Sequence, residues 1–361
     1  FFLIFQPLYL QELGASPVLI GTILGAMGIA MALLQIPAGY LTDKVGPRPV
    51  MWASWMLGAS AAWVMALSSG LSMFIIGLFL YGMTSFVVAP MNAYISSVRG
   101  TWSVGRALTF ISAIYNFGAV LGPIAGGYIG EKFGLKNTFI IGAVVFILST
   151  AVIFFVKAAK EVPHTHEVKT NGRLWHNRRF LVLVGLMFFT MLALYLPQPL
   201  TPNYLQNVHR VDTQWIGILA AIGNLGNALV TLFLGSMNPV RGFLAGQLLV
   251  GIFSFTMWRG TNAAWFGIGY FCLGGYRLCR SMALANTRPL VRATEVGLAF
   301  GMIETANAAA IILAPVLAGF LYNQSPPSIY AVALLCIAAV MLINILVLPR
   351  LRQPDPQPSP G

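Results

Sequence analysis

Long apolar runs with short polar interruptions occupy almost the whole chain, and Val18 to Ala38 is the first complete example. A helix that crosses a bilayer needs ~20 mostly apolar residues, because only helices and closed barrels satisfy their backbone hydrogen bonds in hydrocarbon. Here 58% of the residues are hydrophobic and 8% are charged, against about 25% charged in soluble domains. Because the runs do not alternate, a barrel is excluded. The chain is therefore predicted to be an all-α integral membrane protein.

The apolar runs and the polar residues between them predict twelve membrane helices. The chain starts inside an apolar segment and without Met, so the first helix is expected to lack most of its length. The predicted helices cover residues 1–11, 17–41, 49–68, 71–95, 105–130, 138–157, 179–203, 213–236, 241–258, 263–287, 296–322 and 328–349.

The longest polar interruption divides the chain into two halves with six predicted helices each. We expect an N-terminal six-helix bundle at 1–156, a linker at 157–178, a C-terminal bundle at 179–350 and a disordered Pro-rich tail at 351–361. The halves repeat each other at an offset of 192 to 196 residues, as in LGPIAGGYI (121–129) and LAPVLAGFL (313–321). Because each half has an even number of helices, the two bundles are predicted to lie parallel in the membrane.

The basic residues predict the orientation of these helices. Fifteen lysines and arginines lie in loops on the side of the linker, and four lie on the opposite side. Basic loops stay in the cytoplasm, so the linker and C-terminus are predicted to be cytoplasmic in a protein of the cell membrane. The net charge of +12 is explained by this topology, and we expect no nucleic-acid partner.

A polar segment, GYLTDKVGPRPV from Gly39 to Val50, lies between the second and third predicted helices. Its glycines would let two helix ends approach closely, and Asp43 could cap a helix or pair with a cation. The alternative is a plain tight turn. We interpret the segment as a gating loop formed by Gly39, Asp43, Lys44, Gly46 and Arg48.

This segment resembles the signature loop of the major facilitator superfamily of secondary transporters, G-x-L-[small]-D-[basic]-x-G-[basic]-[basic], with Pro47 in place of one basic residue. The twelve predicted helices and the parallel repeat extend the resemblance over essentially the whole chain. The resemblance implies two six-helix bundles, alternating access and a small-molecule substrate.

A second family motif, G-x-x-x-G-P-x-x-G-G, lies in the fifth predicted helix. In the family it is associated with drug/proton antiporters, whereas an arginine that the family carries in the fourth helix is Leu78 here. Glycines at every fourth position allow helices to pack backbone to backbone, and a proline is expected to loosen the helix. Simple close packing is the alternative to an antiporter role. The motif residues are Gly118, Gly122, Pro123, Gly126 and Gly127.

Three charged residues lie well inside predicted helices, away from their ends: Arg277, Arg280 and Glu304. Charges within a membrane are costly and therefore mark functional sites. At 1.5 Å per residue, Arg280 and Glu304 lie at matching depths, ~12 Å from the loop that joins their helices, so we expect them to pair. We interpret Glu304 as the group that binds a proton or a cationic substrate, and the arginines as its partner or as anion contacts. The alternative is a static ion pair that only supports packing.

Uncharged polar residues in other predicted helices are further candidates for lining a substrate cavity, or alternatively for hydrogen bonds between helices. They are Asn116, Tyr195, Asn224 and Asn307. His164 and His166 form an H-x-H pair without further ligands, so no metal site is predicted. The chain has neither a phosphate-binding loop nor a nucleophile and base in catalytic arrangement, so neither a cofactor nor an enzymatic activity is expected.

We therefore predict a monomeric, alternating-access secondary transporter that exports a small organic solute or drug in a proton-coupled reaction. One alternative is uptake of an anionic solute by Arg277 and Arg280. A second alternative is a membrane sensor or scaffold that transports nothing.

Overall fold

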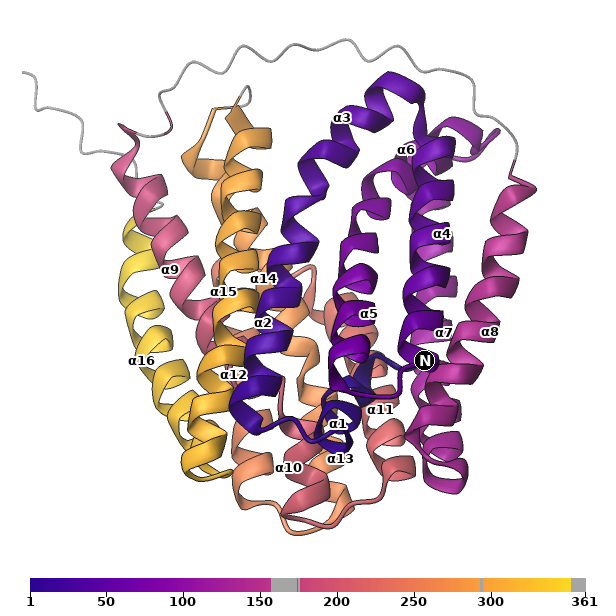
Figure 1. Cartoon of the computed structure of the whole chain (residues 1–361). Coiled ribbons are helices and arrows are strands. Elements are labelled where there is room, and N and C mark those ends of the chain that lie inside the picture. The colour runs from indigo at the N-terminus through magenta and orange to yellow at the C-terminus, as the bar shows by residue number, and fades with distance from the viewer. Residues whose placement is uncertain (157–173, 175, 293–294, 352–361) are drawn as a thin grey trace, which may run out of the picture. The chain divides into compact units, whose positions relative to one another are not determined.

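A computed structural model describes residues 1–156, 174, 176–292 and 295–351, apart from the side chains of residues 36, 43, 89 and 105. The predicted tail after Leu351, most of the predicted linker and the His164–His166 pair lie outside these residues. Within the described part, all regular secondary structure is helical, as Figure 1 shows. This confirms the predicted fold class.

The first half of the chain forms a series of α-helices with two short 3-10 helices. In chain order they are η1 (Leu3–Phe5), α1 (Gln6–Glu12), α2 (Pro17–Leu33), α3 (Gln35–Val45), α4 (Pro47–Ala66), α5 (Leu71–Met83), η2 (Thr84–Val87), α6 (Val88–Val98), α7 (Val104–Phe133) and α8 (Leu135–Phe154).

The second half continues with the helices α9 (Arg178–Tyr195), α10 (Thr201–Asn207), α11 (Thr213–Leu234), α12 (Pro239–Arg259), α13 (Ala263–Cys272), α14 (Gly274–Thr287), η4 (Arg288–Leu290), α15 (Val296–Gln324) and α16 (Ser328–Leu351).

Several predicted membrane helices are divided into two, and proline explains most of these breaks. A proline removes one backbone hydrogen bond and its ring collides with the carbonyl group four residues earlier. Pro37 and Pro90 each follow a break at that distance, between α2 and α3 and at η2. Pro197 and Pro199 lie between α9 and α10. Pro123, which we expected to loosen its helix, lies inside α7, and this helix is assigned without interruption from Val104 to Phe133.

Nine helical segments of the described chain are long and apolar enough to cross a membrane. The helix α4 and the divided pair α13 and α14 do not meet this measure. With 14 residues, α14 is too short to cross a membrane by itself. The count of twelve membrane helices remains a prediction.

Contacts between the helices define two compact units. The first contains Phe1–His166, Pro199–Leu225 and Ile312–Ser328, and the second contains Glu167–Gln198, Gly226–Ile311 and Ile329–Gly361. The units differ from the division at the linker, because α10, the first part of α11 and the last part of α15 pack with the first half of the chain. The two six-helix bundles therefore remain a prediction.

In the first unit, α4 packs between α5 and α8, and Figure 1 shows these helices side by side. Two tryptophans of α4 join it to α8. The Trp52 indole nitrogen donates to the Ile153 carbonyl at 3.1 Å, and the Trp55 indole nitrogen donates to the Ser149 hydroxyl at 3.0 Å. These two hydrogen bonds hold α4 against α8.

Amide side chains connect α1 to α10 in the same unit. The Gln11 side-chain oxygen accepts hydrogen bonds from Asn203 at 2.8 Å and from Asn207 at 2.9 Å. Asn207 also donates to the Tyr322 hydroxyl at 3.0 Å, and Asn203 donates to the Pro7 carbonyl at 3.0 Å. Residues about 190 positions apart in the sequence thus share one hydrogen-bonded cluster.

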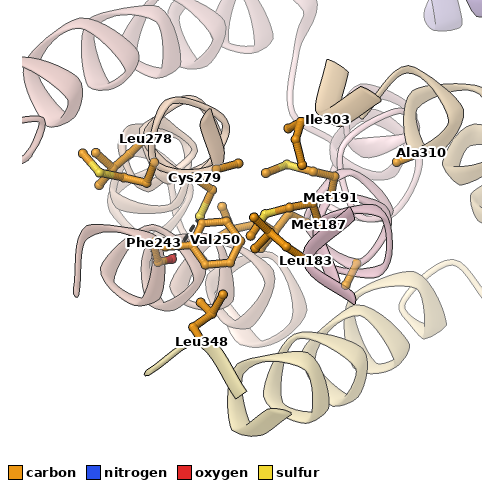
Figure 2. Packing of buried hydrophobic residues seen from close by; sticks show 14 of the residues in the cluster. Leu183, Met187, Met191, Phe243, Val250, Leu278, Cys279, Ile303, Ala310 and Leu348 are labelled. Atoms are coloured by element: carbon orange, nitrogen blue, oxygen red, sulfur yellow. Dashed lines mark hydrogen bonds between the residues drawn. The ribbon is translucent and has the colours of Figure 1, made fainter. Parts of the chain in front are cut away.

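The core of the second unit is built from α9, α12, α14, α15 and α16. Figure 2 shows Met187, Phe243, Cys279, Ile303 and Leu348 within this cluster. The Cys279 thiol is fully buried and donates to the Phe243 carbonyl at 3.2 Å. This cysteine therefore packs between α12 and α14.

Candidate transport site

The predicted gating loop is mostly helical. α3 continues through Gly39 to Val45, and α4 begins at Pro47, so only Gly46 lies between the two helices. Our expectation of a polar loop over 39–50 is therefore wrong except at Gly46, where the chain turns between the two helices. The apolar pattern ends near residue 41, but the helix continues by another turn because its backbone hydrogen bonds need no apolar neighbours.

The structure explains why a glycine is needed at position 46 but not at position 39. Gly46 has a φ of +83°, which only glycine adopts readily, whereas a Cβ at helical Gly39 would meet nothing within 4 Å. Neither glycine is in close contact with another helix in this structure, contrary to our expectation. Gly46 is required by the turn itself.

Replacing Gly46 with alanine should destabilise the protein by roughly 1–2 kcal/mol, because a Cβ disfavours positive φ. Gly39→Ala is the matched control, and it should be neutral or slightly stabilising because alanine favours helices. Thermal unfolding of the two purified variants in detergent would test this difference. Equal unfolding temperatures would contradict it.

Two of the basic residues in the segment lie in different environments. Lys44 is exposed at the end of α3. The Arg48 guanidinium lies 4.3 Å from the centre of the Trp52 ring, so this cation is held against α4. The side chain of Asp43 lies outside the described residues. The gating role of this segment remains a proposal.

Only some glycines of the α7 motif are in close contact with other segments of the chain. A Cβ at Gly118 would meet nothing within 4 Å, whereas one at Gly122 would lie 3.1 Å from the Phe1 nitrogen. A Cβ at Gly126 would lie 2.7 Å from the Phe1 carbonyl oxygen, and one at Gly127 would lie 2.8 Å from the Thr213 carbonyl oxygen. The motif therefore brings α7 close to η1 and to the start of α11.

Two corresponding glycine–proline contacts in the first unit reflect the internal repeat. A Cβ at Gly217 would collide with the Pro123 carbonyl, and a Cβ at Gly21 would collide with the Pro315 carbonyl. These two pairs correspond to each other at the predicted offset of 192 to 196 residues. A glycine of α11 thus packs against the carbonyl group of the proline inside α7. In the same way, a glycine of α2 packs against the carbonyl group of the proline inside α15.

The charges predicted to lie within the membrane form a bidentate ion pair between α14 and α15. The Arg280 Nη2 and Glu304 Oε2 atoms are 2.7 Å apart, and Nε lies 3.1 Å from both carboxylate oxygens. Charge-assisted contacts of this bidentate kind are strong hydrogen bonds. The Arg280 side chain is 50% exposed and that of Glu304 is 34% exposed. The pairing predicted from their depths is present.

A second polar contact lies one turn along the same two helices. The Tyr276 hydroxyl donates to the Asn307 side-chain oxygen at 2.8 Å. Tyr276 precedes Arg280 by four residues, and Asn307 follows Glu304 by three, so each pair shares a helix face. The Tyr195 ring of α9 lies 5.6 Å from the Tyr276 ring. The structure therefore groups Tyr195, Tyr276, Arg280, Glu304 and Asn307.

Tyr276 was missed by the sequence analysis. Its signal was the spacing of four residues from Arg280 on a helix, which places both side chains on one face. Tyrosine is common among the packing residues of membrane helices, so the spacing alone did not separate Tyr276 from them. Its hydroxyl became distinctive only through the bond to Asn307.

The remaining candidates lie elsewhere. Arg277 is exposed on α14 and makes no hydrogen bond or ion pair with the described part of the chain. Asn116 and Asn224 belong to the first unit. The Asn224 amide donates to the Ala119 carbonyl of α7 at 2.7 Å, so it serves as a contact between helices.

These helices and charged groups define a multi-span helical membrane protein. Residues 1–275 match the sequence profile of the Major Facilitator Superfamily, and the chain therefore belongs to this family of transporters. The resemblance that the motifs indicated is thus confirmed.

Curated relatives are similar over much of the chain. An uncharacterized MFS-type transporter of Methanocaldococcus jannaschii is 24% identical over 268 residues, which cover 68% of this chain and 65% of that protein. The quinolone resistance protein NorA of Staphylococcus aureus is 22% identical over 357 residues, which cover 94% of this chain and 90% of NorA.

Solved transporters share the fold. The nucleoside transporter NupG superimposes with a TM-score of 0.82 at 12% identity, covering 97% of this chain and 94% of NupG. The peptide transporter POT superimposes with a TM-score of 0.75 at 16% identity, covering 93% of this chain and 86% of POT.

Proposed function

We propose that this family member exports a small organic solute in exchange for protons, as a monomer in the cell membrane with its linker and C-terminus in the cytoplasm. The observation that carries the proposal is the partly exposed ion pair of Arg280 and Glu304. A carboxylate that can accept a proton and a guanidinium that keeps its charge form an element whose charge state can change during a transport cycle.

Export is supported by the similarity to NorA, whose name describes resistance to quinolones, over 94% of this chain. The glycine motif of α7 and the segment from Gly39 to Arg48 support a family mechanism in which helix ends separate and rejoin. We assign the gating role to this segment and the coupling role to Glu304.

Uptake of an anionic solute is the second candidate function. It is favoured by Arg277, which is exposed and has no ionic partner among the described residues. An Arg277→Ala variant that loses binding of an anion would support uptake over export.

Glu304→Gln should make solute flux in vesicles independent of an imposed pH gradient. Glutamine still accepts hydrogen bonds from Arg280 but cannot take up a proton, so the geometry is kept while the charge change is lost. Arg280, Tyr276 and Tyr195 are the charged or titratable groups grouped with Glu304 in the structure.

The matched control is Arg259→Gln at the end of α12, where the guanidinium lies 5.1 Å from the centre of the Trp258 ring. This variant should keep the wild-type dependence on the gradient. Unchanged pH dependence in both Glu304→Gln and Arg280→Ala would overturn the coupling role.

A further inference from the structure

The ion pair of Arg280 and Glu304 restricts which solutes it can accept. Each group holds the other through a bidentate contact, with Nη2 and Oε2 only 2.7 Å apart. A charged solute that binds either group therefore has to separate the pair. The group left behind then needs a new partner, because an unpaired charge within a membrane protein is strongly unfavourable.

The two groups differ in how they can be neutralised. A cationic solute on Glu304 would leave a guanidinium, which stays protonated at any physiological pH. An anionic solute on Arg280 would leave a carboxylate, which becomes neutral only by taking up a proton. A solute with both a cationic and an anionic group replaces both partners and leaves no charge unpaired.

The pair is accessible to such a solute. Arg280 and Glu304 keep 50% and 34% of their side-chain surface exposed. Intramembrane charges face a bundle interior or an aqueous path rather than lipid, so this exposed surface is suited to meet a dissolved molecule. Arg277, three residues before Arg280, adds another positive charge, which favours a solute that contains an anionic group.

The neighbouring residues provide further contacts for a dipolar molecule. Asn307 is 4% exposed, and its side-chain nitrogen donates no hydrogen bond within the described chain, although its oxygen accepts one from Tyr276. The Tyr195 and Tyr276 rings lie 5.6 Å apart beside the charged pair. An amide group and aromatic rings thus lie about one helical turn from the two charges along α14 and α15.

We propose that the solute is dipolar: its anionic group binds Arg280 and its cationic group binds Glu304, in place of the ion pair. This proposal rests on the transport function proposed above and specifies the substrate class of the same site. It also explains exchange with protons, because a proton and the cationic group of the solute compete for one carboxylate.

Sets of probes that share a carbon skeleton would test the proposal. Phenylalanine carries both charges, phenethylamine carries only the cationic group, and 3-phenylpropionate carries only the anionic group. Tryptophan, tryptamine and indole-3-propionate form a second set. Radioligand binding to the purified full chain at fixed pH should be about 10-fold tighter or more for the dipolar member of at least one set, a difference of about 1.4 kcal/mol.

Variants would then assign each charge to its residue. Arg280→Gln should remove the preference for the dipolar probe over the amine, and Glu304→Gln should remove its preference over the acid. Arg259→Gln should change neither preference. Comparing preferences within one variant separates recognition from a general loss of folded protein, because misfolding lowers the binding of every probe together.

Tighter binding of an amine or an acid than of its dipolar counterpart would overturn the proposal, as would the absence of binding in both sets. Transport is measured separately, as movement of the bound probe across the membrane of vesicles under a pH gradient. A dipolar probe that binds through both residues but is not moved would refute transport and leave the binding specificity established.

Discussion

Removing both charges of the ion pair together should preserve folding but strongly reduce transport. In Arg280→Ala/Glu304→Ala, no charge is left without a partner, so the free energy of unfolding should stay close to that of the wild type. Transport of a solute moved by the wild-type protein should fall at least about 30-fold, because a charged contact to the substrate is worth about 2–5 kcal/mol.

The single variants should behave differently from the double variant. Glu304→Ala leaves the Arg280 guanidinium without its partner and should cost about 1–3 kcal/mol of stability. This is less than the 3–5 kcal/mol typical of fully buried pairs, because the side chains keep 50% and 34% of their surface exposed. Arg280→Ala should cost less than Glu304→Ala, since the remaining carboxylate can be neutralised by a proton.

Thermal unfolding in detergent and solute flux in vesicles would separate these effects. A double variant that transports at the wild-type rate would show that the pair only supports packing. A double variant less stable than both single variants would contradict our account of charge burial.

Alanine substitutions within the glycine motif should have opposite effects at positions nine residues apart. Gly127→Ala should destabilise the protein by about 1–3 kcal/mol, because its Cβ would lie 2.8 Å from the Thr213 carbonyl oxygen and a backbone group cannot move aside easily. Gly118→Ala should be neutral or stabilising by up to about 1 kcal/mol, because nothing lies within 4 Å and alanine favours helices.

The repeat offers an independent check of this prediction. Gly217→Ala should be as destabilising as Gly127→Ala, because its Cβ would collide with the Pro123 carbonyl of the same helix pair. Unfolding temperatures of the three variants would decide the matter. A destabilised Gly118→Ala protein would mean that the motif acts through α7 itself rather than through its contact with α11.

The ion pair could be predicted from the sequence because its position follows from helix geometry. Arg280 and Glu304 lie at similar distances from one connecting loop, and a fixed rise per residue converts those distances into depth. The spacing does not fix the face of the helix from which each side chain projects. The bidentate contact and its neighbour Tyr276 therefore had to come from the structure.

The helix boundaries also were predicted only in part from the sequence. Pro37 and Pro90, which follow the break between α2 and α3 and the break at η2, were visible in the sequence. Apolar composition continued past them, so the predicted helices were not divided there. The polar segment after Gly39 was predicted as a loop because of its composition, although helical hydrogen bonding extends to Val45. Composition indicates whether a segment lies in an apolar or a polar environment, but it does not by itself determine the backbone conformation.

The sequence by itself determined that this is a helical membrane protein, since few charges and long apolar runs leave no other consistent solution. Its resemblance to a transporter family came from the motif residues around Asp43 and Pro123. The sequence also identified the charged residues, because so few acidic groups lie within apolar helices. Only the tertiary structure decided which motif glycines are in contact, which groups surround the ion pair and how segments about 190 residues apart join in one unit. Secondary structure follows from hydrogen bonds local to the chain, whereas these features depend on the approach of atoms that the chain brings together only after its helices have packed.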